Sequence, residues 1–295
     1  MKVILLGTGD IAFEVFKRLQ EDSRIELSGV IFDASVDSET NERYKEQIEG
    51  MGGRILAFEE ENLQGIDVIF TCEYRKAILR ELVEKYVFIN CHAGILPKYR
   101  GFSANPWAIM NGESQVGYTI HRMDDKLDNG DIFYVGRFPI SRNETYADLY
   151  DTIFGDMLGR ICDILVGIYE KQIHPVRQEE RGRYCSRFYA GMGDLKDFDK
   201  TSEYIFNLYR CMAKPHGTGV YFIHRGQKYY VGKVVAGMDM QVEDYIGIPG
   251  KVVNSEGAVI WVKTQDNIVA LSEIINENGE NVPEGYFKIG NRLGK

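Results

Sequence analysis

The fold class of this chain is set by Lys2-Val3-Ile4-Leu5-Leu6-Gly7-Thr8-Gly9-Asp10-Ile11-Ala12, an apolar strand that runs through a glycine turn into a helix. Residues 11–19 continue with apolar side chains at helical spacing, and residues 25–32 form a second strand-like run. The same order then repeats, with strands predicted at 54–58, 67–72 and 87–90 and helices at 41–50 and 76–85. This alternation predicts an α/β, Rossmann-like domain whose parallel-rich sheet is covered on both faces.

The glycine turn also fits the pattern G-x-G-x-x-A, and Asp33 follows the second predicted strand. Together they make most of a dinucleotide-binding fingerprint, in which the acidic residue binds a ribose hydroxyl. Taken alone, this pattern favours an NAD(P)-binding oxidoreductase.

A different chemistry is indicated by Asn90-Cys91-His92, at the end of the predicted strand 87–90, and by Asp128 in the loop 124–131. Side chains at i and i+2 of a strand share a face, so Asn90 and His92 are expected to point into one pocket. Active sites of parallel sheets lie at the carboxyl ends of the strands. An amide, an imidazole and a carboxylate that converge there suit acyl transfer, because they can stabilise an oxyanion and move a proton.

The residues after His92 carry a resemblance. The motifs are Asn90-x-His92, Ile95-Leu96-Pro97-x-Tyr99-Arg100-Gly101, Trp107-Ala108-Ile109-x-Asn111-Gly112 and Leu127-Asp128-x-Gly130-Asp131-Ile132. With them the chain resembles the folate-dependent formyltransferase family, over its whole length and most specifically between residues 88 and 135. Many members have Ser-Leu-Leu-Pro where this chain has Gly94-Ile95-Leu96-Pro97. That departure puts the exact substrate in doubt more than the chemistry.

The resemblance implies N10-formyltetrahydrofolate as formyl donor, a primary amine as acceptor and no metal. It implies catalytic roles for Asn90 and His92, which hold the oxyanion and help to move the amine proton, and for Asp128, which orients His92 and receives that proton. Residues expected to bind the folate are Tyr74, Arg75, Ile78, Asp124, Asp125, Lys126 and Leu127. Residues expected to bind the acceptor are Gly7, Thr8, Gly9, Asp10, Lys98 and Arg100.

Beyond residue 135 the pattern changes twice. A long amphipathic helix is predicted at 148–169, and residues 174–202 lack periodicity and read as a linker. After a helix at 203–212, strands are predicted at 219–224, 228–235, 250–254, 258–264 and 267–275. Short strands between turn residues predict a small OB-like β-barrel, as in two-domain formyltransferases. We therefore expect a catalytic domain at 1–173, a linker at 174–202 and a C-terminal domain at 203–295.

The charge composition limits which class of molecule the formyl acceptor can be. The net charge is −9, and the last 95 residues carry ten basic and ten acidic side chains, which argues against a nucleic acid partner and thus against a methionyl-tRNA formyltransferase. The favoured hypothesis is a sugar N-formyltransferase that acts on a nucleotide-linked amino-deoxysugar for polysaccharide or glycan biosynthesis. Five scattered cysteines and the absence of a long apolar run favour a cytoplasmic enzyme without a membrane partner. A homodimer is possible, and the nucleotide and the position of the amine are left open.

Overall fold

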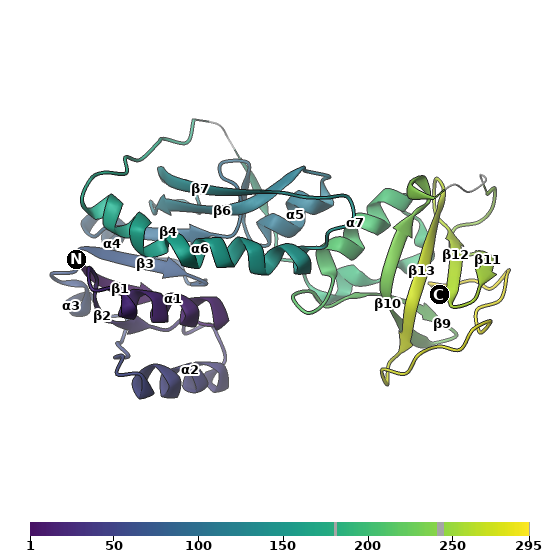
Figure 1. The fold of residues 1–295 in the computed structure, drawn as a ribbon, viewed down its shortest axis with the longest axis horizontal. Helices are drawn as coiled ribbons and strands as arrows, with labels where there is room; N and C mark the ends of the chain where they lie inside the picture. The colour runs from purple at the N-terminus through teal and green to yellow at the C-terminus, as the bar shows by residue number, and fades with distance from the viewer. Residues whose placement is uncertain (180–181, 241–244, 295) are drawn as a thin grey trace. The chain divides into compact units, whose positions relative to one another are not determined.

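The computed structural model describes residues 1–179, 182–240 and 245–294, and its contacts divide the chain into two compact units. The first unit comprises residues 1–105, 116–138 and 151–186, and the second comprises residues 106–115, 139–150 and 187–295 (Figure 1). The boundaries therefore cut through helices α5 (Ala104–Met110) and α6 (Tyr146–Tyr169). Within the described residues no helix is both long and apolar enough to cross a bilayer.

The first unit is built on a six-stranded sheet in the order β2-β1-β3-β4-β6-β7. The strands β1 (Lys2–Leu6), β2 (Glu26–Ile31), β3 (Val68–Cys72) and β4 (Phe88–His92) are parallel to one another. β6 (Gln115–Arg122) runs antiparallel to β4, and β7 (Ile132–Pro139) forms the edge. The mostly parallel α/β sheet expected from the sequence is confirmed.

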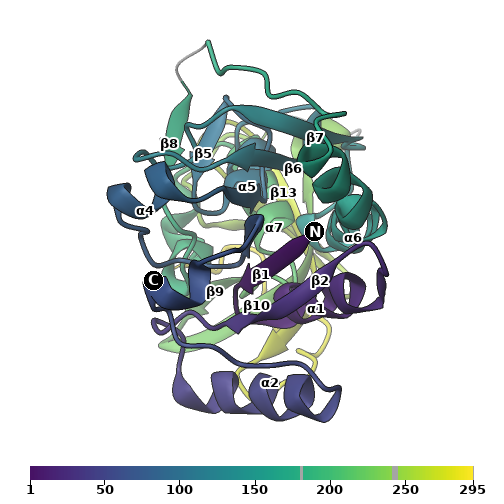
Figure 2. The same ribbon diagram turned by 90° about the vertical axis from the view of Figure 1, so that its left-hand side faces the viewer.

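Helices cover both faces of this sheet. Figures 1 and 2 place α1 (Asp10–Glu21) and α6 on one face and α4 (Arg80–Lys85) on the other. The helices α2 (Ser38–Gly50) and α3 (Glu60–Leu63) lie in the connections between the strands. β1 is buried along four of its five residues and β3 along all five, as both-face coverage requires.

One predicted strand is not formed. Residues 54–58 make a single bridge, between Ile55 and Val30, at the outer edge of the sheet. The segment lies beside β2 and extends its hydrogen bonding only through Arg54 and Leu56. An apolar run can thus pack against a sheet edge without adding a strand.

Residues 174–202, expected as a linker, contain a short strand and two 3₁₀ turns. β8 (Arg183–Cys185) pairs in parallel with β5 (Tyr99–Gly101), and both belong to the first unit. The turns η1 (Ala190–Gly193) and η2 (Lys196–Phe198) belong to the second unit. β8 brings the backbone of Gly182 so close to Pro97 that an added Cβ would lie 1.6 Å from the Pro97 carbonyl oxygen.

The second unit contains helix α7 (Ser202–Met212) and a five-stranded antiparallel sheet in the order β11-β12-β13-β10-β9. The strands are β9 (Val220–His224), β10 (Gln227–Ala236), β11 (Val252–Glu256), β12 (Val259–Lys263) and β13 (Ile268–Asn276), with the turn η3 (Gly237–Asp239) after β10. Thr201 caps α7 by accepting from the Tyr204 amide at 3.1 Å. All five C-terminal strands expected from the sequence are present.

Candidate active site

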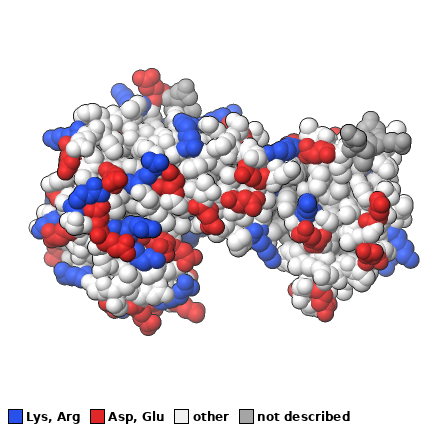
Figure 3. Space-filling view, viewed as in Figure 1, with Lys and Arg blue, Asp and Glu red and all other residues white. Residues whose placement is uncertain are grey.

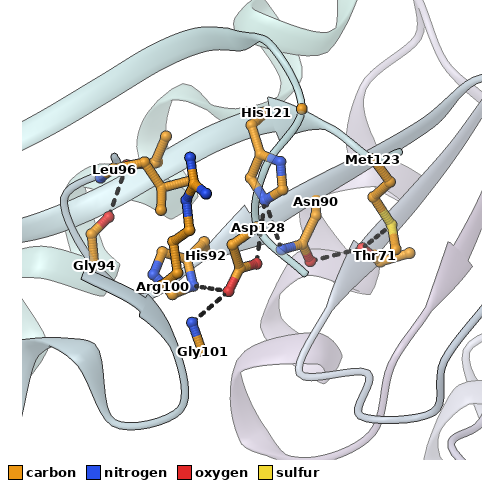
Figure 4. A network of polar contacts seen from close by, with 12 residues as sticks. Thr71, Asn90, His92, Gly94, Leu96, Arg100, Gly101, His121, Met123 and Asp128 are labelled. Atoms are coloured by element: carbon orange, nitrogen blue, oxygen red, sulfur yellow. Dashed lines mark hydrogen bonds and ion pairs between the residues drawn. The ribbon is translucent and has the colours of Figure 1, made fainter. Parts of the chain in front are cut away.

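The carboxyl end of β4 and the turn between β6 and β7 bring Asn90, His92 and Asp128 together in the first unit (Figure 4). Asn90 and His92 are two positions apart on β4 and lie on one side of the strand, as their spacing predicts. Asp128 has a positive φ of 48°, a left-handed conformation that non-glycine residues seldom adopt outside turns. His92 and Asp128 are both buried.

The His92 ring is held at both nitrogens. Nε2 lies 2.8 Å from the Tyr99 carbonyl oxygen, which can only accept, so Nε2 carries the proton of the neutral ring and donates it there. Nδ1 lies 3.4 Å from Asp128 Oδ2. A proton that arrives at Nδ1 would therefore sit between the ring and the carboxylate.

Asn90 is held by two residues that the sequence did not single out. Its Oδ1 accepts from the Thr71 hydroxyl at 2.7 Å, and its Nδ2 donates to His121 Nε2 at 3.1 Å. His121 Nδ1 is paired with the Arg122 carbonyl oxygen at 2.8 Å, so Nδ1 carries the ring proton and Nε2 can accept. With one Nδ2 hydrogen so engaged, the other remains for a substrate oxygen.

The Asp128 carboxylate has three partners around it. Oδ2 accepts from the Gly101 amide at 2.7 Å and faces His92, and Oδ1 lies 3.5 Å from His121 Nε2. Burial acts to raise the pKa of Asp128, but the two histidines and the Gly101 amide together hold this pKa below its ordinary value. Burial lowers the pKa of His92, although the Asp128 charge acts in the opposite direction. At neutral pH the arrangement is therefore a carboxylate beside a neutral imidazole.

Three residues that the sequence did not point to support the candidate catalytic group: Thr71, His121 and Gln178. His121 faces Asn90 across the β4–β6 pair, and a hydroxyl of β3 reaches Asn90 because Thr71 and Asn90 are paired in register. The Gln178 amide donates to the carbonyl oxygens of Asp128 (3.1 Å) and Gly130 (2.7 Å). Thr71 and His121 are polar residues on the strands next to β4, so the sequence could point to them once the strand order is known. Gln178 lies in the segment without periodicity, and no sequence pattern points to it.

The residues expected to bind the folate fall into two segments that one ion pair connects. Arg80 Nη1 lies 3.7 Å from Asp125 Oδ2, which links the segment after β3 to the loop 124–127. Tyr74, Ile78 and Met123 pack against the same core cluster, and burial raises the pKa of Tyr74 to about 12. The Arg75 amide donates to Asp33 at 2.5 Å.

The loop itself is ordered by one side chain. The Asp124 carboxylate accepts from the Lys126 amide at 2.9 Å and from Asn129 at 2.7 Å. Leu127, next to Asp128, is 52% exposed. Lys126 is exposed as well.

The glycine turn at the start of α1 is narrow. Gly7, Thr8 and Gly9 line a cavity of about 10 Å³, at the lower limit for a single water molecule. A Cβ at Gly7 would lie 1.9 Å from the Cys72 carbonyl oxygen, so this glycine allows the close approach of β1 and β3. Asp10 accepts from the Tyr44 hydroxyl at 2.5 Å and lies 3.7 Å from Arg43.

Asp33 does not take the position that a dinucleotide fingerprint requires. It is fully buried, and its carboxylate accepts from the amides of Ser35 and Arg75 at 2.8 and 2.5 Å. Its carboxylate therefore presents no exposed surface to a ribose hydroxyl. The two expected cations on the loop after His92 differ in exposure, because Lys98 is exposed and Arg100 is 6% exposed.

Two family models match the chain. The model described as "Formyl transferase" matches residues 57–155, and the model described as "Formyl transferase, C-terminal domain" matches residues 196–290. Among curated proteins, the methionyl-tRNA formyltransferase of Thermus thermophilus is 30% identical over 239 residues, which cover 78% of this chain and 74% of that relative.

Solved structures share the fold. One is WlaRD, a sugar 3N-formyl transferase with dTDP and 5-N-formyl-THF, at a TM-score of 0.67, 21% identity, and coverage of 94% of this chain and 98% of that one. Another is an N-formyltransferase from Helicobacter canadensis in complex with folinic acid and dTDP-3-aminofucose. Its TM-score is 0.66 at 20% identity, with coverage of 93% of this chain and 100% of that one.

Proposed function

Because the chain belongs to the formyl transferase family, we propose that it transfers a formyl group from N10-formyltetrahydrofolate to the primary amine of a nucleotide-linked amino-deoxysugar. The observation that carries this chemistry is the grouping of Asn90, His92 and Asp128 at the carboxyl end of β4. Formyl transfer to an amine needs a hydrogen-bond donor for the developing oxyanion and a base for the amine proton. The group supplies both.

Asn90 is the oxyanion donor. Thr71 fixes its Oδ1 and His121 takes one Nδ2 hydrogen, so the amide cannot turn over and its remaining N–H keeps one direction. A fixed donor stabilises the charge that develops on the carbonyl oxygen without reorganisation, and loss of a comparable donor costs about 3–4 kcal/mol in the transition state.

His92 is the base for the amine proton. The nitrogen that can accept is Nδ1, because Nε2 is committed to the Tyr99 carbonyl. The imidazolium that results is stabilised by the Asp128 carboxylate 3.4 Å away. Asp128 thus lowers the cost of proton transfer, and the proton held between His92 and Asp128 can pass to N10 of tetrahydrofolate as the bond between N10 and the formyl carbon breaks.

The formyl donor, which supplies the group to be transferred, would be held by the loop 124–127 and by Tyr74, Arg75 and Ile78. The exposed apolar side chain of Leu127 beside the buried Asp128 suits coverage by a flat ring. The Arg80–Asp125 ion pair would fix the spacing of the two segments. These residues bind and orient the donor and take no part in proton transfer.

The acceptor is assigned from two observations. The chain carries a net charge of −9 without a compensating basic C-terminal unit, which disfavours tRNA, and both similar solved structures named above are sugar or N-formyltransferases with dTDP or a dTDP-linked amino sugar. On the acceptor side we propose Lys98, Arg100 and the turn of Gly7, Thr8, Gly9 and Asp10. Many curated relatives are methionyl-tRNA formyltransferases, so that activity is the competing candidate.

Activity assays on alanine variants test the proposal. N90A, H92A and D128A should each lower turnover by about two orders of magnitude or more while the protein stays folded. H174A, which removes an exposed histidine, is the matched control and should leave turnover unchanged. Acceptors are nucleotide-linked 3-amino and 4-amino sugars together with initiator methionyl-tRNA. Near-native turnover by any two of the three site variants contradicts the assignment.

A further inference from the structure

Arg100 is a buried cation whose contacts among the described residues are with neutral groups. Its Nη2 donates to Gln178 Oε1 at 2.8 Å, its guanidinium lies 5.9 Å from the centre of the Tyr184 ring, and its Nε is buried without a hydrogen-bond partner. Burial of a charge without a counter-charge is strongly disfavoured. Among the described residues the guanidinium thus has no counter-charge, and an oxyanion of a ligand would supply one.

Gln178 holds the guanidinium without neutralising it. Both of its amide hydrogens are used by the carbonyl oxygens of Asp128 and Gly130, so its oxygen is the atom that faces Arg100. The Asp128 carboxylate accepts from the Gly101 amide and lies 3.4 Å from His92 Nδ1 and 3.5 Å from His121 Nε2. Through Nη2, Arg100 therefore meets a neutral oxygen, and one side chain ties it to the turn that carries Asp128.

The groups around Arg100 come from β8 and the residues just before it, and we call the described residues 178–179 and 182–185 the strap. Gln178, Gly182 and Tyr184 lie between the two segments that the family models match. Gly182 lets the strap approach Pro97, and the β5–β8 pair places Tyr184 opposite Arg100. The strap thus supplies the neutral partners of Arg100.

We propose that Arg100, held by Gln178, is an oxyanion subsite that binds the phosphate of the acceptor next to the His92–Asp128 pair. This inference rests on the proposed formyl transfer for the identity of the acceptor and on the geometry alone for the presence of an anion site. The carboxylates of the folate tail offer the same oxyanion chemistry. The acceptor is favoured because Arg100 is connected to residues 128–130, whereas the segments proposed for the folate are connected through Arg80 and Asp125.

Binding of inorganic pyrophosphate, measured by isothermal titration calorimetry, tests the site without any formyl transfer. Wild-type protein should bind it saturably, and R100M should bind about tenfold or more weakly. Q178E should weaken binding as strongly, because it places a carboxylate where Gln178 Oε1 now lies 2.8 Å from Nη2. R137M removes an exposed arginine of β7 and should bind like wild type.

Equal affinity of R100M, Q178E and wild type, or no binding by wild type, overturns the subsite. Circular dichroism and the thermal midpoint check that each variant is folded, and Q178E alone decides the matter if R100M does not fold.

Steady-state kinetics identify the source of the anion. R100M should raise the KM for the nucleotide-linked acceptor about tenfold or more and leave the KM for the formyl donor unchanged. A rise confined to the donor KM overturns the assignment to the acceptor. If pyrophosphate binding depends on Arg100 but no nucleotide-linked amino sugar is formylated, the subsite stands and the proposed function fails.

Discussion

At the scale of single residues, the position of His92 between a carbonyl and a carboxylate defines which nitrogen does the chemistry. The Tyr99 carbonyl fixes the proton of the neutral ring on Nε2, and the Asp128 carboxylate lies 3.4 Å from Nδ1. The pKa of His92 is lowered by burial, so the ring is neutral and able to accept a proton over the physiological range. Histidine and carboxylate therefore divide the work, with the first as base and the second as its counter-charge.

This division predicts the pH dependence of kcat/KM. Activity should rise with pH as His92 loses its proton and should level off below the ordinary histidine value of about 6.5, because burial lowers this pKa. The Asp128 charge raises the pKa of His92, so D128N should move the rising limb to still lower pH and reduce the plateau. Initial rates from about pH 4.5 to pH 9 measure both effects. If D128N shifted the rising part of the pH profile to higher pH, kcat/KM would not depend on the protonation of His92.

Gly94 and Ile95 are the two residues at which this chain departs from the Ser-Leu-Leu-Pro of many relatives, and the structure gives a reason for Gly94. A Cβ at residue 94 would lie 2.4 Å from Ala104 Cβ and 2.7 Å from His92 Nε2. Neither contact is tolerable, so the imidazole would have to leave the Tyr99 carbonyl.

G94S should therefore lower kcat by about tenfold or more, with a smaller loss of stability of about 1–3 kcal/mol. Turnover and thermal midpoints of G94S and of G155S separate the two effects, because Gly155 has open space around it on α6. Full activity of G94S would mean that the loop 93–97 can move without disturbing His92.

At the scale of elements, Asn105 joins the start of α5 to β6 within the first unit. Its side chain donates to the Gly117 carbonyl oxygen and accepts from the Gly117 amide, both at 2.9 Å, and it is fully buried. A Cβ at Gly117 would lie 1.9 Å from the Gly136 carbonyl oxygen, so β6 approaches β7 closely at the same point. The pair of hydrogen bonds holds the strand that carries His121.

N105A should lower the free energy of unfolding by about 2–4 kcal/mol, because it leaves a buried N–H and a buried C=O without partners. Denaturant titration of N105A measures this loss, with N143A as a control at an exposed position. A change as small as that of N143A would indicate that water replaces the amide.

The sequence predicted which helices and strands form better than it predicted which of them pair with one another. Strands and helices that pack locally, such as β1, α1 and α6, carry their own apolar period, and most were placed to within a few residues. Residues 54–58 and β8 differ because their pairing depends on partners far along the chain: Ile55 meets a strand edge and Tyr184 meets Arg100. No local pattern encodes such a pairing.

The candidate site shows the same limit. Asn90, His92 and Asp128 were predicted together because two of them share a strand face and the third sits in a specific motif. Their supports could not be found, since Thr71 and His121 reach Asn90 only through the strand order β3-β4-β6. Gln178 reaches the Asp128 turn from a segment that has no periodicity.

At the scale of the whole molecule, charge separates the two candidate acceptors. Residues 201–295 are electrically balanced, so the entire net charge of −9 falls on residues 1–200. On the face shown in Figure 3, basic and acidic side chains of the described residues are intermingled in both units. Proteins that bind RNA through its phosphates need a concentrated basic surface, and their affinity falls steeply with salt. A nucleotide-linked sugar carries few charges and needs one local anion site instead.

We therefore expect weak binding of initiator methionyl-tRNA, with a Kd of about 10 µM or higher at about 150 mM salt. Fluorescence anisotropy against labelled tRNA at about 50 and 200 mM salt measures the affinity and its dependence on counterion release. The Thermus thermophilus methionyl-tRNA formyltransferase serves as the positive control under the same conditions. Formylation rates complete the comparison, because kcat/KM should favour a nucleotide-linked amino sugar over methionyl-tRNA. Tight tRNA binding together with faster formylation of methionyl-tRNA would reverse the acceptor assignment, while the roles of Asn90, His92 and Asp128 would stand, since both reactions pass a formyl group to a primary amine.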